Sequence, residues 1–156
     1  MANPVNPVPD GFHTATPDMI IKGAAEAIEF YKQAFGATEM RRHADPDGKV
    51  RHAQIKIGDS PIMVADEFPE FAEWRGPQAR CGSPVHIYLY VADADAVFNR
   101  AIAAGATQLL PMQDQWYGDR SGGVTDPFGH VWYIATQKEI VSPEEIAKRA
   151  AAQGRP

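Results

Sequence analysis

The sequence repeats itself at a distance of 69 residues, and this repeat limits the chain to folds built from two similar units. Two segments recur at that spacing: Ala25-Glu26-Ala27-Ile28 as Ala94-Asp95-Ala96-Val97, and Gly36-Ala37-Thr38 as Gly105-Ala106-Thr107. In the second copy, a β-branched and aromatic run over 84–91 precedes helical spacing that begins at Asp93, so a strand is followed by a helix and a glycine stop. Each copy is therefore expected to be a supersecondary unit that packs on the other.

Composition excludes several classes of partner. The 156 residues suffice for two small modules around a sizeable core. A net charge of −5 without a lysine or arginine cluster argues against binding to nucleic acid or to an anionic membrane surface. No apolar run approaches the ~20 residues of a membrane span, and no signal pattern opens the chain. Cys81 is the single cysteine, which fits a reducing, cytoplasmic location and a thiol without a catalytic role.

The first copy is predicted to form a strand, a helix and three further strands, at 12–21, 24–35, 38–43, 50–57 and 61–65. Pro17 requires an edge position or a bulge in the first strand. Gly36 has the place of a terminating left-handed residue. Asp45-Pro46-Asp47-Gly48 is typical of a turn, so the second and third strands should form a hairpin.

The second copy repeats this order, and the whole chain divides into five segments. Strands are expected at 84–91, 107–113, 118–125 and 130–136, with a helix at 93–104. Ser142-Pro143-Glu144-Glu145 is a capping box that predicts a last helix to about residue 152, docked weakly because its apolar face is thin. The segments are a flexible N-terminal arm (1–11), a first βαβββ module (12–66), a linker (67–83), a second βαβββ module (84–137), and a C-terminal helix and tail (138–156).

Two motifs resemble a known superfamily. Ala27-Ile28-Glu29-Phe30-Tyr31 on the first helix and Asp126-Pro127-Phe128-Gly129-His130 before the last strand are similar to the vicinal oxygen chelate superfamily of glyoxalases, bleomycin resistance proteins and extradiol dioxygenases. Within it, 23–36, 52–60, 116–120 and 126–132 look most like the PhnB-like group. The resemblance covers about 14–136 and implies an α+β fold of two curled mixed sheets that form cups, commonly in a homodimer. Such a fold alone does not define a reaction.

The resemblance also implies where a metal would bind. Metal-using members place ligands on the first and last strands of each module, histidine or glutamine early and glutamate late. His86 matches one such position, whereas the other three hold Thr16-Pro17, Ile62-Met63-Val64 and Tyr133. We therefore expect no resident cofactor. The alternative is a divalent metal (Zn, Ni, Mn or Fe) bound by His86, with His52 or His13 recruited together with Asp119 to complete the three or more ligands that a metal needs.

Aromatic residues supply the other functional signal. His86, Tyr88 and Tyr90 share one face of their strand by its period of two, so they either line a cup or pack beneath a helix. If they line the cup, they suit a planar organic ligand. The candidate ligand-binding residues are His52, His86, Tyr88, Tyr90, Trp116, Arg120 and Trp132. For His52 the alternative is an ordinary cross-strand position, and for Arg120 it is an ion pair with Asp119 instead of a clamp on an anionic ligand.

These features favour a small-molecule-binding protein that holds a planar or aromatic ligand in a β-cup without a complete metal site. The alternative is a glyoxalase-like or dioxygenase-like metalloenzyme that acts on a vicinal-oxygen substrate through a metal on His86. A third class, an interaction module, would use the loop 68–74 as a hydrophobic contact patch.

Overall fold

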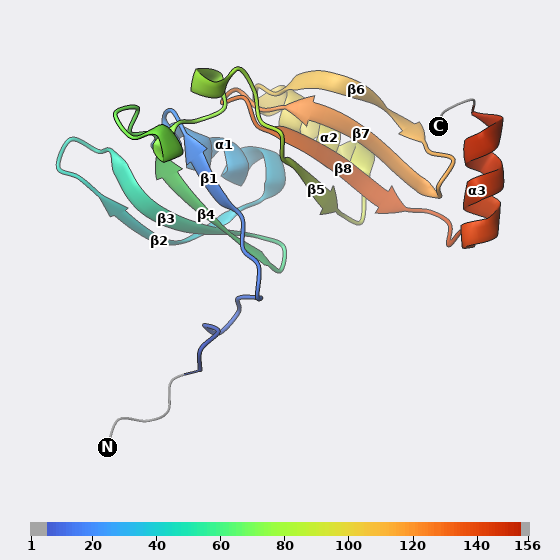
Figure 1. The fold of residues 1–156 in the computed structure, drawn as a ribbon, viewed down its shortest axis with the longest axis horizontal. Helices are drawn as coiled ribbons and strands as arrows, with labels where there is room; N and C mark the ends of the chain where they lie inside the picture. Colours follow the sequence, from blue (N-terminus) through green and yellow to red (C-terminus); the bar gives the residue numbers. More distant parts are fainter. Residues whose placement is uncertain (1–5, 154–156) are drawn as a thin grey trace. The chain divides into compact units, whose positions relative to one another are not determined.

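The computed structural model describes residues 6–153, and the chain divides after Gly82 into two compact units. The first unit contains β1 (Asp18–Ile21), α1 (Ala24–Phe35), β2 (Thr38–Ala44), β3 (Val50–Ile57), β4 (Ser60–Asp66) and the short 3-10 helices η1 (Ala72–Trp74) and η2 (Gln78–Arg80). Its sheet has the order β1-β4-β3-β2 (Figure 1). β1 is parallel to β4, and the other neighbours are antiparallel.

The second unit repeats this arrangement. It contains β5 (His86–Tyr90), α2 (Ala94–Ala104), β6 (Thr107–Asp114), β7 (Asp119–Thr125), β8 (Val131–Gln137) and α3 (Pro143–Ala152). Its sheet has the order β5-β8-β7-β6, again with one parallel pair, β5 and β8. The predicted α+β fold of two βαβββ modules with a short C-terminal helix is thus confirmed.

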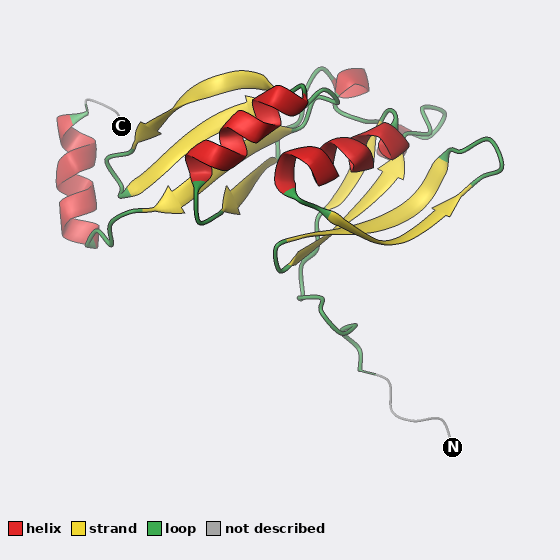
Figure 2. Ribbon diagram, turned by 180° about the vertical axis from the view of Figure 1, so that it is seen from behind, coloured by secondary structure: helices red, strands yellow, loops and turns green. Residues whose placement is uncertain are grey.

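Each sheet has one face covered by a helix and one face left open. Figure 2 shows α1 on one side of the first sheet and α2 on one side of the second. Beneath α1 the core contains Ile21, Ile28, Tyr31, Ile55 and Val64, all fully buried. Beneath α2 it contains Phe98, Ala101, Val124, Trp132 and Ile134. Burial of these apolar side chains supplies the main stabilisation of each unit. The open faces are not needed for this core and can contact other molecules.

The repeat is offset by 70 residues at the start of each helix and by 69 at its end. Ala24 donates its backbone N–H to Asp66 Oδ1 at 2.9 Å, and Ala94 donates to Thr136 Oγ1 at 2.9 Å. These bonds make Ala24 equivalent to Ala94, 70 residues later. The expected pairing of 25–28 with 94–97 is therefore wrong by one residue, because α1 has 12 residues and α2 has 11.

Several element limits differ from expectation. The first strand begins at Asp18, because Pro17 has no backbone N–H to donate and bonds to β4 only through its carbonyl, which accepts from Met63 at 2.9 Å. The expected linker, 67–83, contains η1 and η2, and all of it except Ser83 belongs to the first unit. Residues 1–5 of the expected arm and 154–156 of the tail lie outside the described residues. None of the helices in 6–153 is long and apolar enough to cross a membrane.

The C-terminal helix is confirmed, and polar contacts hold it. Ser142 caps it by accepting a hydrogen bond from the Glu145 backbone N–H at 3.2 Å. Arg149 donates to both carboxylate oxygens of Glu139 at 2.9 Å and to the Trp116 carbonyl at 3.3 Å. The helix has no buried residue, so its placement depends on these contacts with the β6–β7 hairpin and with the segment after β8.

Candidate functional site

Four aromatic rings form a continuous row on the open face of the second sheet. The ring centroids of His86 and Tyr133 are 5.4 Å apart, those of Tyr133 and Tyr88 are 5.7 Å apart, and those of Tyr88 and Tyr90 are 5.1 Å apart. Tyr133 and Tyr88 stack with an interplanar angle of 6°. We call these four residues the ring ladder.

The pairing of β5 with β8 creates this ladder. The strands are parallel, and Tyr88 lies directly opposite Tyr133 in the register. His86, Tyr88 and Tyr90 follow at every second position, so all three share the open face. Tyr88 is 39% exposed and Tyr90 is 65% exposed. The structure thus decides between the two sequence alternatives: these rings line the open face and do not pack beneath a helix.

The hydroxyl groups of the ladder converge on one carboxylate. Asp119, only 6% exposed, lies at the start of β7. Its Oδ2 accepts hydrogen bonds from the hydroxyls of Tyr90 at 2.9 Å and Tyr88 at 3.3 Å. The Tyr88 hydroxyl also lies 3.5 Å from that of Tyr117, which is 3.5 Å from Ser121 Oγ. These bonds fix the hydroxyl edges of Tyr88 and Tyr90, and stacking on neighbouring rings holds the rest of the ladder.

The same contacts keep both tyrosines protonated. Burial, followed by the Tyr117 hydroxyl, raises the pKa of Tyr88. The hydrogen bond to Asp119, followed by burial, raises the pKa of Tyr90. A phenolate would face the negative charge of Asp119, so the neutral phenol is favoured. Tyr88 and Tyr90 therefore present uncharged rings throughout the physiological pH range.

This network predicts a specific alkaline titration. Both folded-state pKa values are raised above the unfolded value of about 10, so the stabilisation is complete below that pH and is lost as pH rises through the folded values. Asp119→Asn should lower the pKa of Tyr90 most, because its bond to Asp119 is the largest cause of the shift. Ultraviolet absorbance of phenolate against pH measures this. Identical titration curves for the wild type and Asp119→Asn would show that Asp119 does not control the phenols.

A pocket of about 360 Å³ adjoins the ladder at Tyr133. Its walls come from the β6–β7 hairpin and β8: Leu110, Gln113, Gln115, Trp116, Tyr117, Ser121, Gly122 and Tyr133. The glutamine amides and the serine hydroxyl offer hydrogen bonds, and the rings and Leu110 offer apolar contact. Polar and apolar surface contribute about equally to this lining, so the pocket suits a small molecule that carries groups of both kinds.

The C-terminal segment fixes the hairpin that forms one wall. The carbonyl of Gly118 accepts hydrogen bonds from the backbone N–H groups of Lys138 at 2.9 Å and Glu139 at 3.0 Å. Gly118 has φ +101°, and a Cβ there would collide with the Glu139 carbonyl and with Val141. Only glycine therefore fits this turn, and Trp116 and Tyr117 beside it are held in place.

Two predicted ligand-binding residues lie elsewhere. Trp132 is fully buried, and its indole N–H donates to Asp126 Oδ2 at 2.9 Å. It alternates with Tyr133 on β8, so it belongs to the core under α2. Arg120 donates to the Asp95 carboxylate at 2.6 and 2.8 Å and to Asp114 at 3.2 Å. The expected pair with Asp119 is wrong, because the two residues alternate on β7.

The carboxylates also decide whether Arg120 can act as a clamp. Asp95, and after it Asp114, raises the pKa of Arg120, and Arg120 in turn lowers the pKa of Asp95. Two carboxylates thus occupy the guanidinium, which makes it a poor clamp for an anionic ligand. His52 lies in the first unit on β3, half-buried, with its Nε2 3.3 Å from the Gln54 side-chain amide. It belongs to the open face of that unit.

The donor set around His86 does not fit a metal centre. Its ring neighbour is Tyr133, where metal-using members would have glutamate. Within residues 6–153, no three His, Cys, Asp or Glu side chains form a group able to hold a metal ion. A Lewis-acid metal needs three or more such ligands, so we derive no chemical step through one. Asp119, considered from the sequence only as a metal ligand or as a partner of Arg120, accepts from the ladder hydroxyls instead. Ser121 was not predicted at all, because such contacts depend on strand register.

Comparison with known proteins identifies the family of this chain. The profile of the Glyoxalase/Bleomycin resistance protein/Dioxygenase superfamily matches residues 12–134. The chain belongs to this superfamily. It is 40% identical over 141 residues to the uncharacterized protein Rv0887c of Mycobacterium tuberculosis, covering 89% of this chain and 83% of that protein.

Two solved structures share the superfamily fold. The Arabidopsis thaliana gene product At5g48480 has a TM-score of 0.65 and 26% identity, over 81% of this chain and 99% of that one. A putative 3-demethylubiquinone-9 3-methyltransferase, the PhnB protein of Bacillus cereus, has a TM-score of 0.63 and 18% identity, over 80% and 99%. The PhnB likeness stated from the sequence is thus supported at the level of the fold.

Proposed function

We propose that this superfamily member is a small-molecule-binding protein that holds a planar aromatic ligand against the ring ladder without a resident metal. The observation that carries the proposal is the parallel stacking of Tyr88 on Tyr133, on an open sheet face beside a pocket. Large rings exposed in this way lose apolar contact with water when a flat molecule covers them. The ligand would stack on the ladder and place its polar edge at Gln113, Gln115 or Ser121.

The ring faces, and not the hydroxyls, are expected to recognise this ligand. Asp119 accepts from both Tyr88 and Tyr90, so these hydroxyls are already satisfied. A binding site of this kind selects for flatness and tolerates variation at the ligand's edge, because stacking requires only a π-face.

Calorimetric titration of 2-naphthamide tests the proposal, with the saturated decahydronaphthalene-2-carboxamide as the non-planar control ligand. Tyr133→Ala should weaken 2-naphthamide binding by about tenfold or more, because it removes the central ring. Tyr133→Phe should change the affinity by no more than about twofold. Val85→Ala, an exposed position outside the ladder, is the matched control. Equal binding of the planar and saturated amides would refute recognition by stacking.

Elemental analysis of protein purified without an affinity tag separates this proposal from the metalloenzyme alternative. We expect no stoichiometric metal and an unchanged affinity for 2-naphthamide after chelation. Near-stoichiometric Zn, Ni, Mn or Fe that disappears in His86→Ala would favour the alternative, a glyoxalase-like or dioxygenase-like enzyme.

We also propose that the protein is a cytoplasmic homodimer. The superfamily resemblance supports the dimer, and the single cysteine, Cys81, supports a reducing location. Light scattering coupled to size-exclusion chromatography measures the oligomeric state directly.

A further inference from the structure

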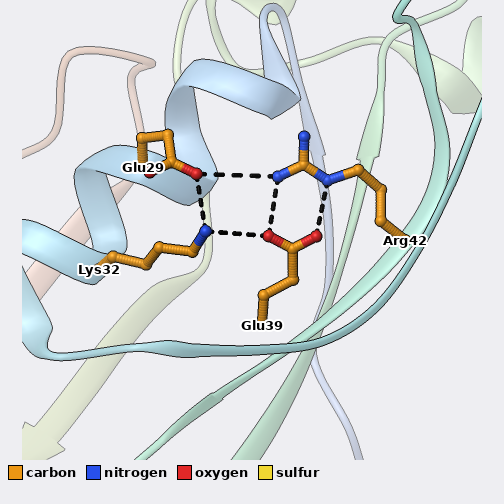
Figure 3. Close-up of polar contacts among 4 residues, drawn as sticks. All are labelled: Glu29, Lys32, Glu39 and Arg42. Atoms are coloured by element: carbon orange, nitrogen blue, oxygen red, sulfur yellow. Dashed lines mark hydrogen bonds and ion pairs between the residues drawn. The ribbon is translucent and has the colours of Figure 1, made fainter.

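Two adjacent arginines on β2 point to opposite faces of the first sheet. Arg42 lies opposite the buried Ala53 in the register, on the face that α1 covers. It donates to both carboxylate oxygens of Glu39, at 2.8 and 2.9 Å. Figure 3 shows this pair joined with Glu29 and Lys32 in a closed network of ion pairs. The charge of Arg42 is thus neutralised by its neighbours.

Arg41 lies opposite Gln54, on the open face. Within the described part of the chain, no ion pair involves Arg41, whereas Arg42 takes part in two. An arginine presents five N–H donors in a rigid fork that matches a carboxylate. The protein has a net charge of −5. Even so, Arg41 lies beside a cavity without a carboxylate partner among the described residues, so its guanidinium is available to an anionic ligand.

That cavity has a volume of about 470 Å³ and lies entirely within the first unit. It is lined by Pro9, Phe12, His13, Thr16, Met40, Arg41, Gln54 and Met63. No aspartate or glutamate is among these residues, and Asp18, the register partner of Met63, does not line the cavity. The lining therefore combines one fixed positive charge with hydrogen-bonding groups and apolar walls.

The lining residues come from four parts of the unit: the segment before β1, and strands β2, β3 and β4. A bulge between Glu39 and Arg41 marks the place of Met40, which is 48% exposed. Gln54 is held in place through its contact with His52 at 3.3 Å. The segment 9–16, which precedes β1, contributes Pro9, Phe12, His13 and Thr16 to the lining. Methionine side chains adapt to irregular apolar ligands.

We propose that this cavity binds a small organic carboxylate with an apolar body. The Arg41 guanidinium pairs with the carboxylate, His13 and Gln54 supply further hydrogen bonds, and Met40, Met63 and Phe12 contact the apolar body. The cavity belongs to the first unit and the ring ladder to the second, and this proposal does not depend on the function proposed for the ladder. The volume lies in the range of small-molecule sites, about 300–1,000 Å³.

Calorimetric titration of 4-phenylbutyrate tests this site, with 4-phenylbutanol as the neutral isostere and inorganic phosphate as the anion without an apolar body. The acid should bind, and the alcohol should bind about tenfold more weakly or worse, because it lacks the charge-assisted bonds. Phosphate should not compete. Arg41→Ala should weaken 4-phenylbutyrate binding by about tenfold or more, and Arg41→Lys should restore only part of the affinity.

Arg42→Ala is the matched control, because it removes the same charge from the neighbouring position on the other face. It should leave the affinity for 4-phenylbutyrate within about twofold of the wild type, because a charge on the other face of the sheet does not touch the ligand and is screened by salt. Tyr133→Ala, which impairs the ladder, should also leave it unchanged. Absence of binding, equal losses in Arg41→Ala and Arg42→Ala, or equal affinity for acid and alcohol would each overturn the proposal.

Discussion

Replacement of Asp66 by alanine is expected to lower the free energy of unfolding by about 3–5 kcal/mol. This carboxylate is 8% exposed and accepts three backbone N–H groups, from Gly23 at 3.0 Å, Ala24 at 2.9 Å and Val50 at 2.7 Å. Two of these donors, Gly23 and Ala24, lie at the start of α1, where the N-cap residue Gly23 has no side chain to cap the helix. Without Asp66, three donors in or near the core are left unsatisfied. Denaturant unfolding measures the loss.

The second module suggests the control for this prediction. Thr136 holds the equivalent position and accepts from Ala94. Asp66→Thr should therefore retain the bond to the start of α1, lose the bond to Val50, and cost about half as much as the alanine variant. Asp59→Ala, at an exposed turn, should change stability by less than about 0.5 kcal/mol. If Asp66→Ala were as stable as Asp59→Ala, the three hydrogen bonds would not be contributing.

Trp132→Ala is expected to cost about 3–5 kcal/mol, the usual cost of removing a large buried aromatic side chain. The indole is fully buried and donates to Asp126, so the change leaves a cavity and removes a buried hydrogen bond. Trp132→Phe should cost less, because it keeps most of the ring and loses the hydrogen bond. Thermal or denaturant unfolding measures both variants.

Trp116→Ala provides the contrast, because Trp116 is half-buried at the pocket wall. It should change stability by about 1 kcal/mol or less and weaken 2-naphthamide binding. A Trp132→Ala protein with wild-type stability and reduced ligand affinity would contradict the core assignment of Trp132. It would support the ligand-binding role that the sequence predicted.

The sequence predicted the fold well because the signals for it are local. Gly36 ends α1 in the left-handed conformation, as expected, with φ 67°. Asp93 caps α2 by accepting from the Ala96 backbone N–H at 3.0 Å, and Asp45-Pro46-Asp47-Gly48 joins β2 to β3. Such signals need only neighbouring residues, so the element order of both modules could be predicted without knowledge of their packing.

The candidate site was predicted only in part, because its contacts depend on register between distant strands. Alternation placed His86, Tyr88 and Tyr90 on one face, but it could not show which face α2 covers. Asp119 and Arg120 are neighbours in sequence, and an ion pair between them was one of the two alternatives for Arg120. In the sheet they alternate, so one meets Tyr90 and the other meets Asp95. Likewise, Arg41 and Arg42 look alike in sequence, and only the register with β3 separates them.

The measurement that tests the ring ladder most directly is the set of intermolecular nuclear Overhauser effects between 2-naphthamide and the protein. Contact with the Tyr88 and Tyr133 rings, together with upfield ring-current shifts of the naphthyl protons, is the predicted result, because stacking places the ligand over both ring faces. Bound 2-naphthamide with no contact to either tyrosine, or with contacts confined to the first unit, would contradict the account of the second sheet's open face as the ligand site.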